Sequence, residues 1–390
     1  MYRFWIALTL VCSLSSNLRA ETARLVQGLG NGPPIPAPPS LQATGYLLID
    51  ATNGEIIVEH NSDEPLPPAS LTKMMTAYIA EREIEAGRVF LDDKVPVSVN
   101  SWQTGGSRMF IREGTEVSLR DLLRGIVIQS GNDASVAVAE YIAGSEDVFA
   151  DVMNKTAVSL GMTNTQFKNA TGLPAEGHYS TAKDLSLLAA RIIKDFPQAY
   201  AIYKEKSFSY NGIKQANRNS LLFRDATFDG LKTGHTEEAG YCLVASAERD
   251  GFRLISVVMG TVSEKAREQE TIKLMQYGFR YFRGQIVFEV DQPLPKSSRK
   301  VWFGETETVD LAPTEPLYVT LPLGRESAIK AILDAPDTFD APLEIGPTVG
   351  IVKVMLGERV LAESPVAFAS AVPEGGFFKR LADFVLKLFA

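Results

Sequence analysis

The chain has 390 residues, of which 45% are hydrophobic and 22% charged, so it is long enough to form two domains with a large core. Its formal net charge is -8 and it contains no run of Lys and Arg, which argues against a nucleic-acid partner. Two cysteines and three scattered histidines cannot build a disulfide framework or a zinc site. We therefore expect no metal and no cofactor.

The N-terminus has the pattern of a secretory signal peptide. Arg3 precedes an apolar run over residues 4–14, which is too short for an ordinary membrane span, and the small Ala20 suits cleavage. We predict a signal peptide over residues 1–20 and a linker, rich in Gly and Pro, over residues 21–40. An uncleaved N-terminal anchor is the alternative, because the positive region is thin.

An α+β fold is predicted for residues 41–283, with an antiparallel sheet flanked by helices. Two apolar, β-branched runs flank Asn53-Gly54, which is a strong hairpin signal. Ser263 is a plausible cap for the last helix. The expected elements are a hairpin over residues 45–59, helices between residues 70 and 194, strands at residues 241–247 and 252–259, and a helix over residues 263–282.

Short alternating runs punctuated by Pro, Gly and Asp predict a small β-sandwich domain over residues 284–372. Two roles suit this domain: a spacer that lifts the active site from a membrane, or a partner-binding surface.

The C-terminal residues 373–390 are predicted to form an amphipathic, membrane-anchoring helix. From residue 377 onward apolar side chains recur with a period of 3.6, and the charged side chains lie on the other face. The segment is too short to cross a bilayer, but residues 377–389 can lie in the membrane interface. The alternative is a helix docked on the protein's own core. The charged residues are Lys379, Arg380, Asp383 and Lys387.

Three short motifs follow one another along the chain and together supply hydroxyls and amines. They are Ser70-Leu71-Thr72-Lys73, Ser130-Gly131-Asn132 and Lys232-Thr233-Gly234. S-x-x-K alone is weak, since it recurs at residues 297–300 and 327–330, but only its first occurrence is followed by the other two motifs. The ordered set is typical of acyl transfer by a serine enzyme that does not use histidine as its base.

The first motif offers a nucleophile and its base. Ser70 is expected at the N-terminus of a helix that starts near Leu71, with Lys73 one turn on and on the same face. The amine must be neutral to accept the serine proton, so desolvation and a second cation, for which Lys232 is suited, must lower its pKa from about 10.4. The Ser70 backbone N–H is a candidate oxyanion donor. Ser70 alone could equally be a helix cap.

The second motif is expected on a turn between helices. There the Ser130 hydroxyl can relay a proton between Lys73 and a leaving amine. The Asn132 side chain can donate to a substrate carbonyl or contact Lys73. The alternative is an N-cap serine followed by a turn asparagine.

The third motif is expected to open a strand beside the nucleophile. Lys232 and Thr233 suit a substrate carboxylate, and Gly234 lets an acyl-peptide backbone pair with the strand edge. The backbone N–H of His235 is a second candidate oxyanion donor, whereas its side chain is expected to bind or to support structure.

These three motifs together carry a resemblance to a known family. The chain resembles the penicillin-binding, low-molecular-mass D-alanyl-D-alanine carboxypeptidases over residues 40–282, and also in the β domain and amphipathic tail. The resemblance implies acylation of Ser70, with Lys73 as general base, Ser130 as proton shuttle and Lys232 binding the terminal carboxylate. It implies Asn132, Thr233, and the Ser70 and His235 amides as further substrate contacts. Gly234 stands with this substrate-binding set.

The function expected is a secreted serine carboxypeptidase that removes the terminal D-alanine from peptidoglycan pentapeptides and is acylated by β-lactams. It would act at the periplasmic face of the cytoplasmic membrane. A β-lactamase, a DD-endopeptidase and a non-catalytic wall-binding module are the alternatives. Class A β-lactamases need a glutamate that activates water, and the matching region, residues 169–176, offers only Glu176. We assign no chemical role to His178 and Asp184.

Overall fold

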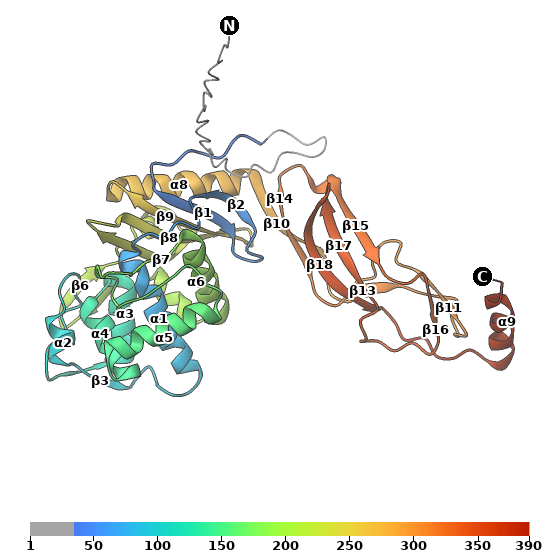
Figure 1. Cartoon of the computed structure of the whole chain (residues 1–390), viewed down its shortest axis with the longest axis horizontal. Coiled ribbons are helices and arrows are strands. Elements are labelled where there is room, and N and C mark those ends of the chain that lie inside the picture. The colour runs from blue at the N-terminus through green and yellow to red at the C-terminus, as the bar shows by residue number, and fades with distance from the viewer. Residues whose placement is uncertain (1–34, 390) are drawn as a thin grey trace, which may run out of the picture.

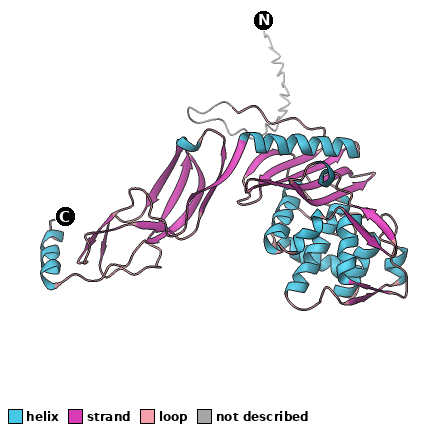
Figure 2. Ribbon diagram, turned by 180° about the vertical axis from the view of Figure 1, so that it is seen from behind, coloured by secondary structure: helices cyan, strands magenta, loops and turns pink. Residues whose placement is uncertain are grey.

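The computed structural model describes residues 35–389 and shows two domains joined end to end, with helix α9 at the far end of the second (Figure 1). The predicted signal peptide over residues 1–20 lies outside the described residues. The first domain contains a sheet with helices on both of its faces, and the second consists of strands (Figure 2). The predicted fold class is confirmed.

A five-stranded antiparallel sheet organises the first domain, in the order β2-β1-β9-β8-β7. The predicted hairpin is confirmed, with Gly54 in the left-handed region at φ +75°, and so is the turn at Asp250 that joins the last two strands. β7 begins before Lys232, so the third motif lies within a strand and does not open it. The strands are β1 Gly45–Asp50, β2 Ile56–His60, β7 Phe228–Thr236, β8 Gly240–Arg249 and β9 Phe252–Thr261.

Alternating side chains of the strands build two cores, one on each face of the sheet. In β1, Leu47 and Ile49 join the core beneath the helical cluster, whereas Leu48 packs toward α8 with Leu274. α8 (Glu264–Tyr281) covers this second face, and the Ser263 hydroxyl accepts from the N–H of Ala266, as predicted for a cap.

The opposite face carries most of the other helices, with two short hairpins beside them, whereas the short helix at residues 221–224 packs in the core on the α8 face through Leu221 and Leu222. The helices are α1 Lys73–Glu85, α2 Val99–Gln103, α3 Leu119–Arg124, α4 Asn132–Ala143, α5 Glu146–Ser159, α6 Ala182–Asp195 and α7 Leu221–Arg224. The hairpins pair β3 (Lys94–Pro96) with β4 (Glu116–Ser118), and β5 (Ser207–Tyr210) with β6 (Ile213–Ala216).

The second domain is built from strands around its own apolar core, as predicted. Its sheets have the orders β10-β14, β12-β11-β16 and β13-β18-β17-β15. The strands are β10 Phe282–Phe288, β11 Arg299–Trp302, β12 Thr308–Val309, β13 Leu311–Pro313, β14 Leu317–Pro322, β15 Ile329–Asp334, β16 Thr338–Asp340, β17 Gly350–Leu356 and β18 Arg359–Phe368.

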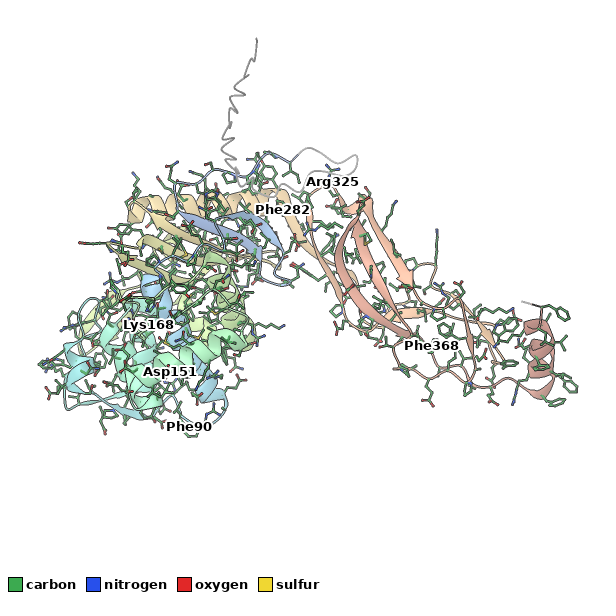
Figure 3. The ribbon with its side chains drawn as sticks, viewed as in Figure 1. Phe90, Asp151, Lys168, Phe282, Arg325 and Phe368 are labelled. Atoms are coloured by element: carbon green, nitrogen blue, oxygen red, sulfur yellow. The ribbon has the colours of Figure 1, made fainter. Side chains whose placement is uncertain are left out.

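A buried carboxylate links the two domains. Asp50, at the end of β1, is fully buried and accepts hydrogen bonds from Tyr318 Oη at 2.8 Å and Thr320 Oγ1 at 2.7 Å, both on β14. Phe282, where α8 passes directly into β10, lies at the same junction (Figure 3). Buried polar groups that satisfy each other across two domains favour a defined angle between them.

Helix α9 (Phe377–Lys387) docks on the β domain through its charged face. Asp383 is buried and accepts from the N–H of Phe303 at 2.8 Å and from Lys379 Nζ at 2.8 Å, while Lys387 Nζ lies 2.6 Å from Asp340. The apolar side chains point away, with Phe378 84% exposed. The alternative of a helix buried on the core is therefore wrong. Within residues 35–389, no helix is both long and apolar enough to cross a membrane.

Candidate active site

Ser70 lies on a short 3₁₀ turn, Ala69–Thr72, that leads into α1. The α-helix begins at Lys73, two residues later than predicted, and Ser70 caps no helix. Ala69 has φ +48°, which turns the chain sharply before the serine. Lys73 Nζ lies 3.0 Å from Ser70 Oγ, so the predicted pairing of hydroxyl and amine is present.

The amine of Lys73 is 1% exposed and is held by two oxygens, Ser70 Oγ and the backbone carbonyl of Thr171 at 2.5 Å. Its pKa is lowered to about 7, mainly by burial, with Asp133 opposing the change and Arg218 contributing to it. The expected lowering of the pKa is therefore present, but burial causes most of it, and the cation that acts on Lys73 is Arg218.

Ser130 pairs with the third motif. It has φ +64° and lies between a π-helical turn, Gly125–Gln129, and α4, which confirms the predicted turn between helices. Lys232 Nζ donates to Ser130 Oγ at 2.9 Å and to the Thr233 carbonyl at 3.0 Å. Burial lowers the pKa of Lys232, and the nearby charges of Lys73, Arg218 and Arg267 lower it further. The buried amines of Lys73 and Lys232 thus each contact a serine hydroxyl.

Asn132 is held by hydrogen bonds to an earlier segment of the chain, residues 105–107. Its Nδ2 donates to the Gly105 carbonyl at 2.6 Å, and its backbone N–H donates to Ser107 at 2.7 Å. The neighbouring Asp133 carboxylate accepts from three successive backbone N–H groups, starting at Met109. Asn132 therefore borders the site, and its hydrogen-bond partner is Gly105 and not Lys73.

The structure gives a reason for a glycine at position 234 that the sequence did not reveal. β7 is the edge strand of the sheet and packs on the turn that carries Ser70. A Cβ at Gly234 would lie 3.0 Å from the Pro68 carbonyl and 3.2 Å from Leu71 Cγ. The glycine therefore lets the strand approach the nucleophile turn. The exposed His235 ring follows and stacks on Tyr241, with 3.9 Å between ring centroids.

A loop over residues 168–178 closes the site behind Lys73. The Asn169 side chain accepts from the N–H groups of Thr171 and Gly172, which shapes the turn. Gly172 has φ +81°, and a Cβ there would lie 1.8 Å from the Ala69 carbonyl. Glu176 is exposed, and the atom of this loop that contacts Lys73 is a backbone carbonyl.

Asp184 supports the structure near this loop. Its carboxylate accepts from the N–H of Asn164 at 2.8 Å and from Thr165 Oγ1 at 2.7 Å.

Sequence reasoning missed two arginines. Arg267 on α8 is 3% exposed, its Nε has no hydrogen-bond partner within residues 35–389, and its charge acts on Lys232. Arg218 is exposed, donates through Nε to the Gln129 carbonyl at 3.1 Å, and acts on both lysines. Thr271 and Leu274 follow Arg267 at helical spacing on the buried face of α8. A charged residue on that otherwise buried face was the sequence signal that could have indicated a functional role for Arg267.

The fold and the site together define a serine acyl-transfer enzyme in which lysine takes the place of histidine. A nucleophile turn, a serine in left-handed conformation and an edge strand bring Ser70, Lys73, Ser130 and Lys232 together from three parts of the chain.

Comparison with known proteins leads to the same class. Residues 34–263 match the D-alanyl-D-alanine carboxypeptidase family, and residues 282–374 match the C-terminal domain of penicillin-binding protein 5. D-alanyl-D-alanine carboxypeptidase DacA of Escherichia coli is 41% identical over 364 residues, which cover 91% of this chain and 90% of that protein. Penicillin-binding protein 5 of Haemophilus influenzae superposes with a TM-score of 0.79 at 38% identity, covering 87% of this chain and 100% of that one.

A penicillin-binding protein of Listeria monocytogenes, solved in an ampicillin-bound form, superposes with a TM-score of 0.57 at 33% identity. It covers 62% of this chain and 98% of its own. The chain belongs to the D-alanyl-D-alanine carboxypeptidase family, and the resemblance drawn from the three motifs is confirmed.

Acylation of Ser70 by penicillin is expected to slow as the pH falls below about 7. The pKa of Lys73 is lowered to about 7, so the amine is neutral above this pH and protonated below it, where it cannot accept the serine proton. The second-order acylation rate should fall about tenfold per pH unit on the acid side. Stopped-flow labelling with a fluorescent penicillin, with circular dichroism to confirm folding, measures this. A flat rate from about pH 5 to about pH 8 would contradict a lysine base.

Proposed function

We propose that this protein is a serine D-alanyl-D-alanine carboxypeptidase that removes the terminal D-alanine from peptidoglycan pentapeptides. The observation that carries the proposal is the presence of two buried pairs of hydroxyl and amine, Ser70 with Lys73 and Ser130 with Lys232, in which the charge of Lys73 acts on Lys232. Its relatives are D-alanyl-D-alanine carboxypeptidases, which supports the same substrate.

In the acylation step, Ser70 Oγ attacks the carbonyl of the peptide bond between the two D-alanines. Its proton passes to the neutral Lys73 amine. As the C–N bond breaks, Ser130 gives its own proton to the departing D-alanine nitrogen and takes the proton held by Lys73 in its place, which returns Lys73 to the neutral amine. Water then cleaves the ester and restores the Ser70 hydroxyl. The backbone N–H groups of Ser70 and His235 are the proposed oxyanion donors.

The terminal carboxylate of the substrate is proposed to bind Lys232 and Thr233, with Arg267 behind them. Arg267 is buried, and although its Nη2 lies 3.7 Å from the exposed Glu264 carboxylate, its Nε has no hydrogen-bond partner within residues 35–389, so an arriving anion would add a second negative partner. The same anion would favour the protonated form of Lys232. A carboxypeptidase gains specificity in this way, because a peptide without a free C-terminal carboxylate does not supply this negative partner. Gly234 lies in β7, the strand with which the substrate backbone is proposed to pair, and Asn132 borders the site.

The β-lactam class of inhibitor fits the same chemistry, since a cyclic amide acylates Ser70 without losing a separate leaving group. The exposed position of Glu176 does not favour fast lactam hydrolysis of the class A kind, so a long-lived adduct is expected. To cleave cross-links, as a DD-endopeptidase does, the site would have to accept a whole peptide chain as the leaving group in place of a single terminal D-alanine.

We further propose export by the N-terminal segment and attachment to the periplasmic face of the cytoplasmic membrane through α9. The support for attachment is the face that the helix turns outward. Its charged face is held by Asp340, Glu374 and the Phe303 amide, and its apolar side chains are exposed. The cations expected to meet lipid head groups are already paired within the chain, so apolar burial would supply most of the attachment. The β domain would then act as a spacer.

Replacing the nucleophile tests the reaction. Ser70→Ala should abolish both penicillin labelling and D-alanine release, because no other hydroxyl in the motif set is paired with Lys73. Ser327→Ala, which removes the exposed first residue of another S-x-x-K, is the matched control and should behave like the parent. Intact-mass spectrometry and an assay of released D-alanine give the two readouts. Labelling that persists in Ser70→Ala would remove Ser70 from the mechanism.

The two lysines are expected to differ when each is changed to arginine. Lys73→Arg keeps a charge that cannot be lost near neutral pH, so acylation should fall by at least about a hundredfold. Lys232→Arg keeps a partner for a carboxylate and should retain more activity, with most of the loss in KM. Steady-state kinetics on a D-Ala-D-Ala peptide separate the two effects. Equal losses of acylation in both variants would refute the assignment of base and binder.

Membrane attachment is tested on α9. Deleting residues 376–390 should release the protein from anionic lipid vesicles while activity on small peptides remains near normal. Phe384→Asp places a charge in the centre of the exposed apolar face and should weaken vesicle binding almost as much. Ile332→Asp, at another half-exposed apolar position outside the helix, is the control. Co-sedimentation measures binding, and a truncated protein that still pellets would show that another region is the anchor.

A further inference from the structure

His178 occupies a buried position directly behind the S-x-x-K motif. It is 7% exposed, and its Nε2 lies 2.8 Å from Thr72 Oγ1, the residue that precedes Lys73. Its Nδ1 accepts from the backbone N–H of Lys168 at 3.2 Å. Phe167 packs edge-on against the imidazole, with 5.9 Å between ring centroids. Lys168, at the start of the loop, lies within the first domain in Figure 3.

These contacts define the protonation state of the ring. Because a backbone N–H can only donate, Nδ1 must be unprotonated, so the proton is on Nε2 and is donated to Thr72 Oγ1. Burial, with the charges of Lys168 and Lys73, lowers the pKa of His178 to about 4. The ring therefore stays neutral at the pH values at which Lys73 is a free amine, and it cannot act as an acid in that range.

The loop is attached near both of its ends to the segment that carries Ser70 and Lys73, at the nucleophile turn and at the first turns of α1. Thr76 Oγ1 donates to the Ala170 carbonyl at 2.7 Å on one side, and His178 holds Thr72 on the other. Between these points Thr171 presents its carbonyl to Lys73, and Gly172 fits closely against the turn. The loop contacts Lys73 through the backbone carbonyl of Thr171, so this carbonyl is the acting group.

We propose that His178 is a positioning residue for the general base: its hydrogen bond to Thr72 fixes the loop that carries the Thr171 carbonyl, and this carbonyl orients the Lys73 amine. This inference rests on the proposed acylation of Ser70.

The carbonyl has a defined effect on a neutral amine. When one N–H of Lys73 donates to Thr171, the nitrogen cannot rotate freely, and its lone pair can remain directed at the Ser70 hydroxyl. Once the proton has moved, the same carbonyl stabilises the ammonium. A loop that drifts by about 1 Å would lose this alignment, and misplacement of that size costs about a hundredfold in rate.

Three substitutions of His178 separate this role from packing. His178→Ala removes both hydrogen bonds and should slow acylation by penicillin about tenfold to a hundredfold. His178→Gln can place an amide N–H where Nε2 donates to Thr72, and should stay within about threefold of the parent. His178→Asn can accept from Lys168 but is too short to reach Thr72, and should resemble His178→Ala. Thermal melts of each variant report packing separately.

A double-mutant cycle adds a second measurement. Thr72→Val removes the acceptor for His178 and should slow acylation by a similar factor, and the double variant with His178→Ala should be no slower than the slower single variant. A rate for His178→Ala within twofold of the parent would overturn the proposal. So would equal losses in the Ala, Gln and Asn variants, or fully multiplicative effects in the cycle. A parent that penicillin does not acylate would instead refute the proposed function.

Discussion

The site depends on the removal of water from two lysine amines that lie close together. A buried ammonium is costly without a partner, so each amine is held by oxygens that suit a donor: Lys73 by Ser70 and Thr171, and Lys232 by Ser130 and Thr233. Burial lowers both pKa values, and for Lys73 it brings the pKa to about 7. A lysine in this state can accept a proton from serine at neutral pH, so the desolvation of the site is itself part of the chemistry.

The same requirement explains the unusual backbone around the site. Water is excluded only if the nucleophile turn, the loop behind it and the edge strand approach one another closely. Gly172 and Gly234 allow that approach, since a Cβ at either would meet the backbone of the Ser70 turn. Ala69 and Ser130 have positive φ, which is uncommon for residues with a side chain and is held in place here by the packing around them.

The rest of the molecule holds this site at a distance from α9. Asp50 joins the sheet of the first domain to β14 of the second, and buried hydrogen bonds of this kind restrict motion between domains. At the other end, Asp383 and Lys387 hold α9 so that its aromatic side chains are directed outward. The active site and the exposed apolar face of α9 therefore lie in different parts of the molecule.

The sequence by itself determined the class of chemistry, because S-x-x-K, S-x-N and K-T-G name the reacting groups by residue type and order. It also determined the hairpin at Gly54, the cap at Ser263, the all-β second domain and the amphipathic pattern of the tail, since these depend on neighbours in the chain. The helix start at Lys73 and the position of Lys232 within β7 differed from prediction, since packing of the turn on the strand decides both.

Only the tertiary structure decided which groups surround the amines. The Thr171 carbonyl carries no side-chain signature, and Arg218, Arg267 and His178 reach the site from segments distant in sequence. The direction of α9 likewise depends on Asp340 and Phe303, which no periodicity within the helix can reveal. Local patterns encode residue type and face, whereas desolvation and long-range hydrogen bonds arise only when the segments are packed together.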